Sequence, residues 1–410
     1  MNKVFFGDCL DILPTLADDS IDACVTDPPY GLKFMGKDWD HGVPGEHYWR
    51  EVMRVLKPGA NLLAFGGTRT FHRLVCAIED AGFEVRDQIA WLYGSGFPKS
   101  LDVSKAIDKA LGVSGESIPA GAEVRRIRPG ADQEKDGSWE KLSDRTYQPH
   151  EYTAGSAEAQ KWSGWGTALK PAMELICLAR KPLMGTVAKN VMRQGTGALN
   201  IDACRIPTND TLSAGSGGLL SHVRDGKPYP NKNREGEESS DRRYAESGST
   251  NFSMKPGPRG GGTEGRWPAN VIHDGSEEVL AGFPETESGS PCGVKAGGQK
   301  NCFGVFAGGI PVTGFGDSGS AARFFYTAKA NQEERKGSKH PTVKPLDLMR
   351  YLVRLVTPPG GIVLDPFAGT GTTGQAALME GMRYVLIERD EQSIRDIETR
   401  MKGTQVGFPM

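Results

Sequence analysis

Two short segments of this chain combine residue types that can do chemistry, and they stand near its opposite ends. Asp27–Tyr30 reads Asp-Pro-Pro-Tyr and follows an apolar run, and Asp365–Thr373 is a glycine loop that follows another apolar run. The first segment offers a carboxylate, an aromatic ring and main-chain carbonyls beside two prolines, which have no N–H to donate. The second offers backbone that can approach a ligand closely.

The Asp-Pro-Pro-Tyr segment suits a reaction at an amino group attached to an aromatic ring. The lone pair of such an amine is delocalised, so a carboxylate and a carbonyl that accept its N–H bonds would pull it toward tetrahedral geometry. They would also stabilise the positive charge that develops as a group is transferred to it. Tyr30 could stack on an extruded base. The predicted catalytic residues are Asp27, Pro28, Pro29 and Tyr30. A buried loop that uses two prolines as a turn is the alternative.

The glycine loop suits a cofactor with a carboxylate and a ribose but no phosphate. Gly369 and Gly371 allow a tight turn before a helix, and Glu388 ends the next apolar run, where a carboxylate can bind ribose hydroxyls. The loop lacks the third glycine of a dinucleotide fingerprint and the Gly-Lys-Ser/Thr of a phosphate loop. These features favour S-adenosylmethionine. An ordinary strand–turn–helix corner is the alternative.

The elements around both segments alternate between strand and helix patterns, which predicts an α/β fold with a mainly parallel sheet. Helical spacing covers 48–56, 70–81, 347–356, 373–379 and 391–400. Apolar strand patterns cover 3–7, 21–25, 61–65, 85–93, 173–180, 362–367 and 384–388. The core is therefore split between the two ends of the chain, and the middle is predicted to consist of insertions.

Composition supports this division. The chain has 410 residues with 54 glycines and 26 prolines, which indicates long loops. The formal net charge is −2, but 12 basic and 8 acidic residues give 181–260 a charge of +4, so the basic stretch lies in the middle. Seven cysteines without Cys-x-x-Cys spacing argue against a disulfide framework or a zinc site, and we expect no metal. Without an apolar run of membrane-spanning length or a signal peptide, a cytoplasmic protein is expected.

Together the two segments resemble the N6-adenine/N4-cytosine DNA methyltransferases. Their order, with the catalytic region first and the cofactor region last, resembles the β class of that family, and the long insertions resemble those of phage and prophage members. The resemblance implies a Rossmann-like class I S-adenosylmethionine-dependent methyltransferase with a seven-stranded mixed sheet. An antiparallel edge hairpin would be formed by Val85–Tyr93 and Met173–Arg180, and loop-rich target-recognition insertions would be added to the sheet.

The resemblance also implies roles for individual residues. Thr342 and Lys344, in the His-Pro-Thr-Val-Lys-Pro segment, would reach the methionine carboxylate, and Asp8 would contact the adenine of the cofactor. Glu174 would have a structural role in the hairpin. The residues expected to line the methionine and nucleoside are Asp365, Phe367, Gly369, Gly371 and Thr372, with Glu388 on the ribose.

The predicted organisation has five parts. Residues 1–100 form the catalytic half of the core, 101–165 an insertion within the hairpin, 166–182 the edge strand, 183–320 a target-recognition and DNA-binding insertion, and 321–410 the cofactor half. Basic residues in the first insertion and just before it are candidates to hold DNA phosphates: Lys99, Arg125, Arg126 and Arg128. Solvated loops are the alternative for each of them.

The resulting hypothesis is methyl transfer from S-adenosylmethionine to the N6 amino group of a flipped-out adenine in double-stranded DNA. N4-cytosine methylation is the nearest alternative, and Asp27 favours adenine because cytosine enzymes of the family more often carry Ser there. Methylation of RNA or of a protein glutamine, and a non-catalytic DNA- or cofactor-binding protein, are further alternatives. A cognate restriction endonuclease and a homodimer are left open as partners.

Overall fold

The structure is a computed structural model, and it describes most of the chain. The described ranges are 2–32, 42–96, 100–121, 148–208, 265–287, 318–328 and 343–404. For eight two-residue strands only the backbone is described: β6 (Val124–Arg125), β7 (Asp132–Gln133), β8 (Trp139–Glu140), β9 (Thr146–Tyr147), β12 (Val223–Arg224), β13 (Lys227–Pro228), β16 (Lys300–Asn301) and β17 (Gly304–Val305). The chain divides into two compact units, 1–94 with 173–410, and 95–172.

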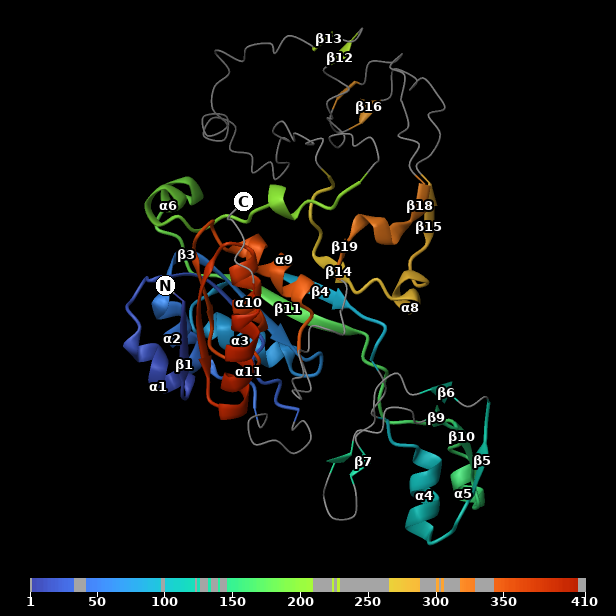
Figure 1. Cartoon of the computed structure of the whole chain (residues 1–410). Helices are drawn as coiled ribbons and strands as arrows, with labels where there is room; N and C mark the ends of the chain where they lie inside the picture. Colours follow the sequence, from blue (N-terminus) through green and yellow to red (C-terminus); the bar gives the residue numbers. More distant parts are fainter. Residues whose placement is uncertain are drawn as a thin grey trace. The chain divides into compact units, whose positions relative to one another are not determined.

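A mixed sheet of nine strands is the centre of the first unit (Figure 1). All neighbouring strands pair in parallel except β11, which is antiparallel to both of its neighbours. In spatial order the strands are β1 (Lys3–Phe6), β21 (Arg383–Glu388), β20 (Ile362–Asp365), β2 (Ile21–Thr26), β3 (Leu56–Gly66), β11 (Met173–Arg180), β4 (Glu84–Leu92), β14 (Val271–His273) and β19 (Tyr326–Thr327).

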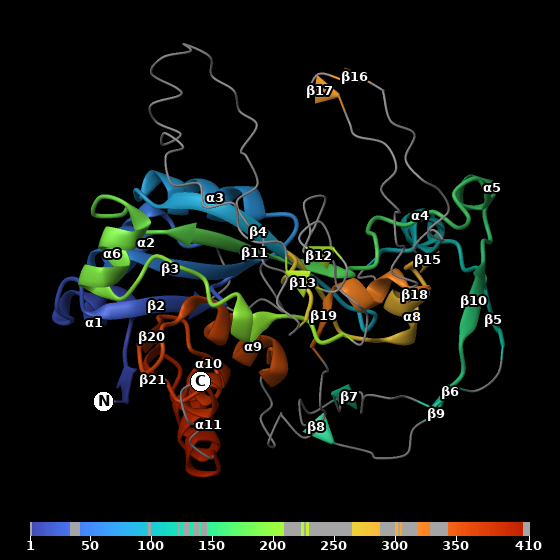
Figure 2. The ribbon, with the colours of Figure 1, turned by 90° about the horizontal axis from the view of Figure 1, so that it is seen from above.

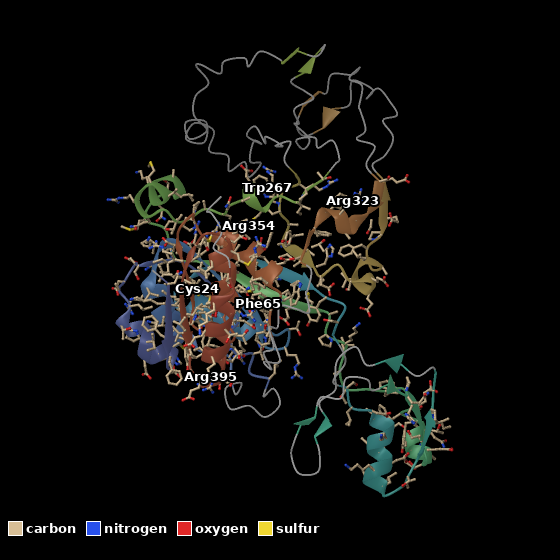
Figure 3. The ribbon with its side chains drawn as sticks, in the orientation of Figure 1. Cys24, Phe65, Trp267, Arg323, Arg354 and Arg395 are labelled. Atoms are coloured by element: carbon tan, nitrogen blue, oxygen red, sulfur yellow. The ribbon has the colours of Figure 1, made fainter. Side chains whose placement is uncertain are left out.

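Helices cover both faces of this sheet (Figure 2). One face packs against α1 (Cys9–Ile12), α2 (Glu46–Val55) and α3 (Phe71–Asp80), and the other against α9 (Leu346–Val356), α10 (Thr372–Met379) and α11 (Glu391–Lys402). Each strand contributes to both faces because successive side chains alternate. Cys24 packs with the first group of helices, whereas Val25 and Phe65 pack with the second (Figure 3).

The α/β class and the mixed sheet are confirmed, and the sheet is two strands wider than predicted. The hairpin of β4 and β11 forms in the predicted antiparallel pairing. It is not at the edge, because β14 and β19 continue the sheet beyond β4. These two strands have three and two residues, and neither was predicted: β14 lies in the predicted insertion 183–320, and β19 lies near the start of the predicted cofactor half 321–410. Strands this short carry no readable periodicity, and they are held by pairing with neighbours distant in sequence.

The remaining described elements of the first unit surround the sheet. They are η1 (Leu13–Thr15), α6 (Val187–Gln194), η4 (Asp202–Cys204), α8 (Glu277–Leu280), β15 (Glu285–Glu287), β18 (Ser318–Ser320) and η6 (Ala321–Phe324). Trp267, just before β14, is 63% exposed, and the Arg205 guanidinium lies 5.3 Å from the centre of its ring (Figure 3).

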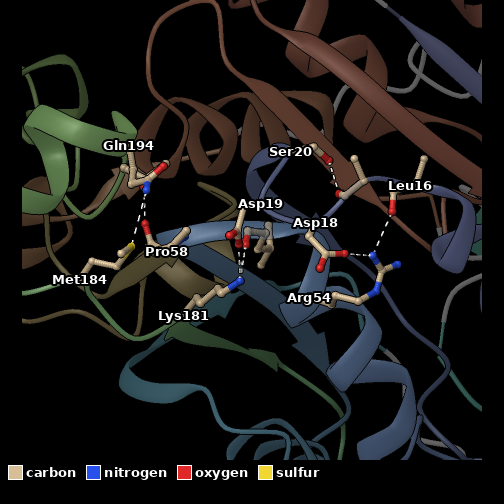
Figure 4. Close-up of polar contacts among 12 residues, drawn as sticks. Leu16, Asp18, Asp19, Ser20, Arg54, Pro58, Lys181, Met184 and Gln194 are labelled. Atoms are coloured by element: carbon tan, nitrogen blue, oxygen red, sulfur yellow. Dashed lines mark hydrogen bonds and ion pairs between the residues drawn. The ribbon is translucent and has the colours of Figure 1, made fainter.

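Polar contacts fix the loop that leads into β2 (Figure 4). Arg54 at the end of α2 donates to the Leu16 carbonyl at 3.0 Å and pairs with Asp18. Lys181, just after β11, donates to Asp19 Oδ1 at 2.6 Å. These contacts set the start of β2, and the far end of this strand leads into Asp27.

The second unit has its own small framework around a buried carboxylate. It contains α4 (Val103–Leu111), β5 (Glu116–Pro119), β10 (His150–Thr153) and α5 (Ala157–Gln160), and β5 and β10 pair in antiparallel fashion. Asp108 is fully buried and accepts hydrogen bonds from the Tyr152 hydroxyl at 2.8 Å and from the Gly155 N–H at 2.7 Å. Because a buried carboxylate needs such donors, this residue organises the end of α4 against the loop before α5.

Among the described residues, none of the helices has both the length and the apolar composition required to cross a membrane.

Candidate active site

The carboxyl ends of four neighbouring parallel strands bring the predicted site residues to one edge of the sheet. Asp27 follows β2, Asp365 ends β20, Glu388 ends β21, and Asp8 follows β1. The prediction that the strands carrying the two motifs lie side by side is confirmed, since Cys24 of β2 pairs with Leu364 of β20. This edge is where α/β folds with parallel strands place ligands.

Asp365 lies beneath the glycine loop and is almost fully buried. Its Oδ1 accepts the Thr26 hydroxyl at 2.7 Å and the Phe367 N–H at 3.1 Å, and its Oδ2 accepts the Thr373 hydroxyl at 2.5 Å. Burial raises the pKa of this carboxyl to about 6 against the opposing effect of these hydrogen bonds, with a smaller contribution from Asp27. In the structure its oxygens therefore organise the loop, and its contact with the cofactor stays a prediction.

The loop backbone has the conformation that its glycines suggested. Gly369 has φ +51°, and apart from its chain neighbours none of the described residues has an atom within 4 Å of where a Cβ would be. Gly371 has φ +79°, and a Cβ there would lie 2.9 Å from Ile397. Residues other than glycine rarely adopt these positive φ angles. Gly369 thus leaves open space for a ligand, whereas Gly371 lets α10, which starts at Thr372, pack closely against α11.

Glu388 lies directly beside this loop. Its Oε2 accepts the Gly369 N–H at 2.7 Å, and its Oε1 accepts the N–H groups of Arg389 and Asp390 at 2.9 and 2.8 Å. Burial raises the pKa of Glu388 above its ordinary value, and these backbone hydrogen bonds oppose that effect. The carboxylate is therefore held in place from the protein side, at the position predicted to meet ribose hydroxyls.

Asp8 caps the short helix α1 and lies at the strand end next to that of Glu388. Its Oδ1 accepts the Leu10 N–H at 2.9 Å, and the Arg389 guanidinium lies 3.6 Å from its Oδ2. Tyr48, which our sequence analysis did not select, belongs to the same region. Its ring centre lies 6.1 Å from that of Phe367, and its pKa is raised by burial and by Asp8. Tyr48 was indistinguishable in sequence from the other residues of an amphipathic helix.

Asp27 is paired with Lys344 in the structure. The Lys344 ammonium donates to Asp27 Oδ2 at 2.6 Å and lies 3.2 Å from Glu174 Oε2. It also lies 5.0 Å from the centre of the Phe65 ring and 5.4 Å from that of Tyr30. Burial lowers the pKa of Lys344, but Asp27 and Glu174 outweigh that effect and hold it well above its ordinary value. The lysine is a cation enclosed by two carboxylates and two rings, and its predicted contact with the methionine carboxylate stays a prediction.

The Tyr30 hydroxyl joins this pair to β11. It lies 2.8 Å from Asp27 Oδ1 and 3.0 Å from Glu174 Oε2. Burial raises the pKa of Tyr30 well above its ordinary value, and the two carboxylates raise it further. Glu174, to which we assigned a structural role from sequence, thus contacts two predicted site residues. Tyr93 directly follows β4, and burial and Glu174 raise its pKa to about 12 while Lys344 opposes the shift.

Five predicted site residues are not located by the structure. Lys99, Arg126, Arg128 and Thr342 lie outside the described residues. Arg125 lies in β6, where the backbone alone is described. Their predicted contacts with DNA phosphates, and that of Thr342 with the cofactor, stay predictions.

Comparison with protein families gives a match along most of the chain. The family model N6_N4_Mtase, described as DNA methylase, matches residues 21–399. A methylase of Escherichia coli strain K12, YubD, is 47% identical over 66 residues, which are 16% of this chain and 29% of that protein. The type II methyltransferase M.HinfI of Haemophilus influenzae is 39% identical over 77 residues, 18% of this chain and 21% of that protein. The matched segments thus span less than a third of the length of these relatives.

Matches among solved structures were also found, at low identity and with TM-scores below 0.5. The complex of M1.HpyAVI with SAM has 12% identity and a TM-score of 0.38, covering 98% of this chain and 100% of the other. TTHA0409 of Thermus thermophilus, described as a DNA modification methylase, has 15% identity and a TM-score of 0.41, covering 100% of both chains. The cytosine-N4-specific PvuII DNA methyltransferase has 13% identity and a TM-score of 0.41, covering 98% of this chain and 86% of the other.

Proposed function

Because the chain belongs to the N6/N4 DNA methylase family, we propose that it transfers a methyl group from S-adenosylmethionine to the N6 amino group of adenine in double-stranded DNA. The family uses S-adenosylmethionine. The observation that carries the proposal is that two segments of the chain lie next to each other at one edge of the sheet. The segment that starts at Asp27 and the glycine loop that starts at Asp365 follow neighbouring parallel strands, and the Thr26–Asp365 hydrogen bond joins them.

The loop fits such a cofactor. The open space at Gly369 admits close approach of a ligand to the backbone, and Glu388 is held beside it with its carboxylate among backbone donors. S-adenosylmethionine supplies an electrophilic methyl group when it is bound. The proposed contacts of the chain are those predicted from sequence, with Glu388 on the ribose, Asp8 toward the adenine, and Thr342 and Lys344 toward the carboxylate.

Asp27 is the proposed acceptor for the substrate amine. Its side chain is 23% exposed, so the carboxylate is accessible from outside, although each of its oxygens also has a donor within the protein. A carboxylate and a main-chain carbonyl of the Asp27–Tyr30 segment would accept the two N–H bonds of the amine and orient its lone pair. They would also stabilise the developing positive charge, and Asp27 would accept a proton late in the reaction. The Tyr30 ring is the proposed stacking surface for the extruded base.

Adenine is proposed over cytosine because Asp27 occupies the first position of the motif. N4-cytosine methylation remains the alternative, and one of the similar structures is described as specific for that reaction. The experiment is expression in a host without adenine or cytosine-N4 methylation, followed by digestion of its DNA and mass spectrometry. We expect N6-methyldeoxyadenosine. If N4-methyldeoxycytidine alone accumulates, the adenine assignment is wrong; if neither accumulates, methylation of DNA is wrong.

The DNA-binding parts are proposed from their position in sequence and from local basic stretches within them, which are Arg125–Arg128 and 181–260. The segments 101–165 and 183–320 are the proposed DNA-contacting insertions, with Lys99, Arg125, Arg126 and Arg128 as phosphate ligands. Replacement of these four residues by alanine should weaken binding to duplex DNA and reduce its dependence on salt concentration. A salt dependence identical to that of the wild type would exclude them. A cognate endonuclease and a homodimer are further proposals, tested by co-purification and by sedimentation.

A further inference from the structure

Both oxygens of the Asp27 carboxylate are hydrogen-bonded within the protein. Oδ1 accepts the Tyr30 hydroxyl at 2.8 Å, and Oδ2 accepts the Lys344 ammonium at 2.6 Å. Each oxygen can accept a second hydrogen bond, but the side chain is only 23% exposed, so an amino group that approaches Asp27 meets an oxygen that already has a protein donor. A second position for that donor would free the lone pair that it occupies and leave both lone pairs of the oxygen to the amine.

Tyr30 has such a position within reach. Its hydroxyl carries one proton, so it can donate to a single acceptor at a time. Two carboxylate oxygens lie at hydrogen-bonding distance, Asp27 Oδ1 at 2.8 Å and Glu174 Oε2 at 3.0 Å. Rotation about the C–O bond of the phenol moves the proton from one acceptor to the other without moving a heavy atom.

Lys344 is less able to move away. It is only 8% exposed and lies against the rings of Tyr30 and Phe65, with its shortest contact to Asp27 Oδ2. Its ammonium lies between Asp27 and Glu174 and offsets the repulsion of two carboxylates that approach the same hydroxyl. Lys344 therefore keeps both acceptors available while Tyr30 changes partner.

We propose that the Tyr30 hydroxyl is a two-position hydrogen-bond switch and that Glu174 is the positioning residue that makes the switch work. In the absence of substrate the hydroxyl occupies Asp27 Oδ1. When the substrate amine binds, the hydroxyl turns to Glu174 Oε2 and Asp27 Oδ1 accepts the amine, while Lys344 stays on Oδ2. This inference rests on the proposed function and adds to it a residue that touches neither substrate nor cofactor.

The electrostatic setting supports a switch that moves no proton between residues. The pKa of Tyr30 is held well above its ordinary value by burial and by both carboxylates, so its hydroxyl remains a donor at neutral pH. Without Glu174, a buried hydroxyl displaced from Asp27 would have no other carboxylate of the described residues to turn to, and an unsatisfied buried donor is costly. The cost would appear only when the amine binds, so it should lower the rate of methyl transfer more than it lowers stability.

The test is a set of single-turnover measurements on the full chain with saturating labelled S-adenosylmethionine and unmethylated plasmid DNA. Glu174→Met removes the second acceptor and should slow transfer by about 10- to 100-fold. Tyr30→Phe alone should slow it by only about 2- to 5-fold. In the Glu174→Met background, Tyr30→Phe should instead speed transfer, because it removes the hydroxyl that has lost its second acceptor.

Controls separate this role from a structural one. Glu84→Met makes the same substitution on β4 of the same hairpin, at a carboxylate that pairs with Arg180 instead of Tyr30, and should leave the rate unchanged. Cofactor affinity should stay within about 2-fold of wild type in every variant. If Glu174→Met does not fold, Glu174→Gln, whose amide oxygen is a weaker acceptor, should show a smaller loss that Tyr30→Phe again offsets.

The outcomes are distinct. A slow Glu174 variant that Tyr30→Phe accelerates supports the switch. A Glu174 variant of full activity, or a double variant as slow as the product of the two single effects, overturns it while the proposed function stands. A wild-type protein that transfers no methyl group to DNA defeats the proposed function, and the switch is rejected with it.

Discussion

The Thr26 hydroxyl donates a hydrogen bond of 2.7 Å to Asp365 Oδ1, across a separation of 339 positions in the sequence. Both residues are almost fully buried. Thr26 ends β2 immediately before Asp27, and Asp365 ends β20 at the start of the glycine loop. This bond therefore helps to fix the distance between the proposed amine-binding segment and the proposed cofactor loop. Pairing of β2 with β20 alone would fix that distance less strictly.

Thr26→Val should loosen this connection with little change in volume. Removal of the hydroxyl takes one hydrogen-bond donor from a buried carboxyl. We therefore expect the variant to unfold at a lower urea concentration, with a free energy of unfolding that is smaller by about 1–3 kcal/mol. Methyl transfer should fall as well, because the two segments lose a fixed separation. Thr26→Ser keeps the hydroxyl and is the matched control. Equal stability of the valine variant and wild type would show that the bond does not hold the segments together.

Asp365 should make stability depend on pH in an unusual direction. Its folded pKa of about 6 lies above its ordinary value of 3.8, so between these values the folded state binds the proton that the unfolded state has lost. Stability from this residue is therefore largest below pH 4 and falls as pH rises to about 6, by on the order of 3 kcal/mol. Urea unfolding of wild type and Asp365→Asn across pH 4–7 isolates this contribution.

The asparagine variant should lack that fall in stability. Its amide does not titrate, so the difference in unfolding free energy between the two proteins should shift in its favour as pH rises through the window. A difference that stays constant from pH 4 to 7 would mean that Asp365 titrates alike in the folded and unfolded states.

Regular elements were predictable from sequence because their own residues carry the pattern. The alternation around β20, α10 and β21 predicted these elements to within about two residues, and the apolar runs that precede Asp27 and Asp365 predicted neighbouring strands. In contrast, β14 is built of three residues, and its place beside β4 depends on pairing partners that no local pattern reveals.

Contacts within the site were less predictable for the same reason. Residue types at Asp27, Glu174 and Lys344 can be read from the sequence, but the meeting of their side chains cannot, because Lys344 stands 317 positions from Asp27. The motif around Lys344 pointed to the cofactor, whereas the structure shows its ammonium on Asp27. The Tyr30–Glu174 contact likewise depends on how β11 inserts between β3 and β4.

Gly369→Ala tests whether the open space beside the loop is the cofactor site. Residue 369 has φ +51°, and no atom of the described residues beyond its chain neighbours lies near a Cβ there, so the variant should lose only about 1 kcal/mol of stability from backbone strain. The added methyl group would occupy the space that we assign to S-adenosylmethionine. The affinity of the variant for S-adenosylmethionine, measured by calorimetry, should therefore fall by at least about 10-fold.

Gly360→Ala is the matched control for that variant. Gly360 has φ +67° and equally open surroundings, but it lies in the turn before β20, at the opposite end of the strand from the loop. Its alanine variant should lose similar stability and bind the cofactor as wild type does. If both variants bind S-adenosylmethionine normally, the ligand does not approach the backbone at Gly369.

Asp27→Ala should separate chemistry from cofactor binding. The carboxylate is the proposed acceptor for the substrate amine, so its removal should lower methyl transfer to DNA by at least about 100-fold. Lys344 keeps Glu174 as a partner, and the Asp365 and Glu388 contacts of the loop are untouched, so cofactor affinity should change by no more than about 3-fold. Filter binding of labelled methyl groups measures methyl transfer, and calorimetry measures cofactor affinity.

Asp27→Asn, which keeps the shape of the side chain but can donate from its amide, should also be nearly inactive. Full activity in either variant would remove Asp27 from the reaction, and loss of cofactor affinity would mean that Asp27 and Lys344 belong to the cofactor site instead.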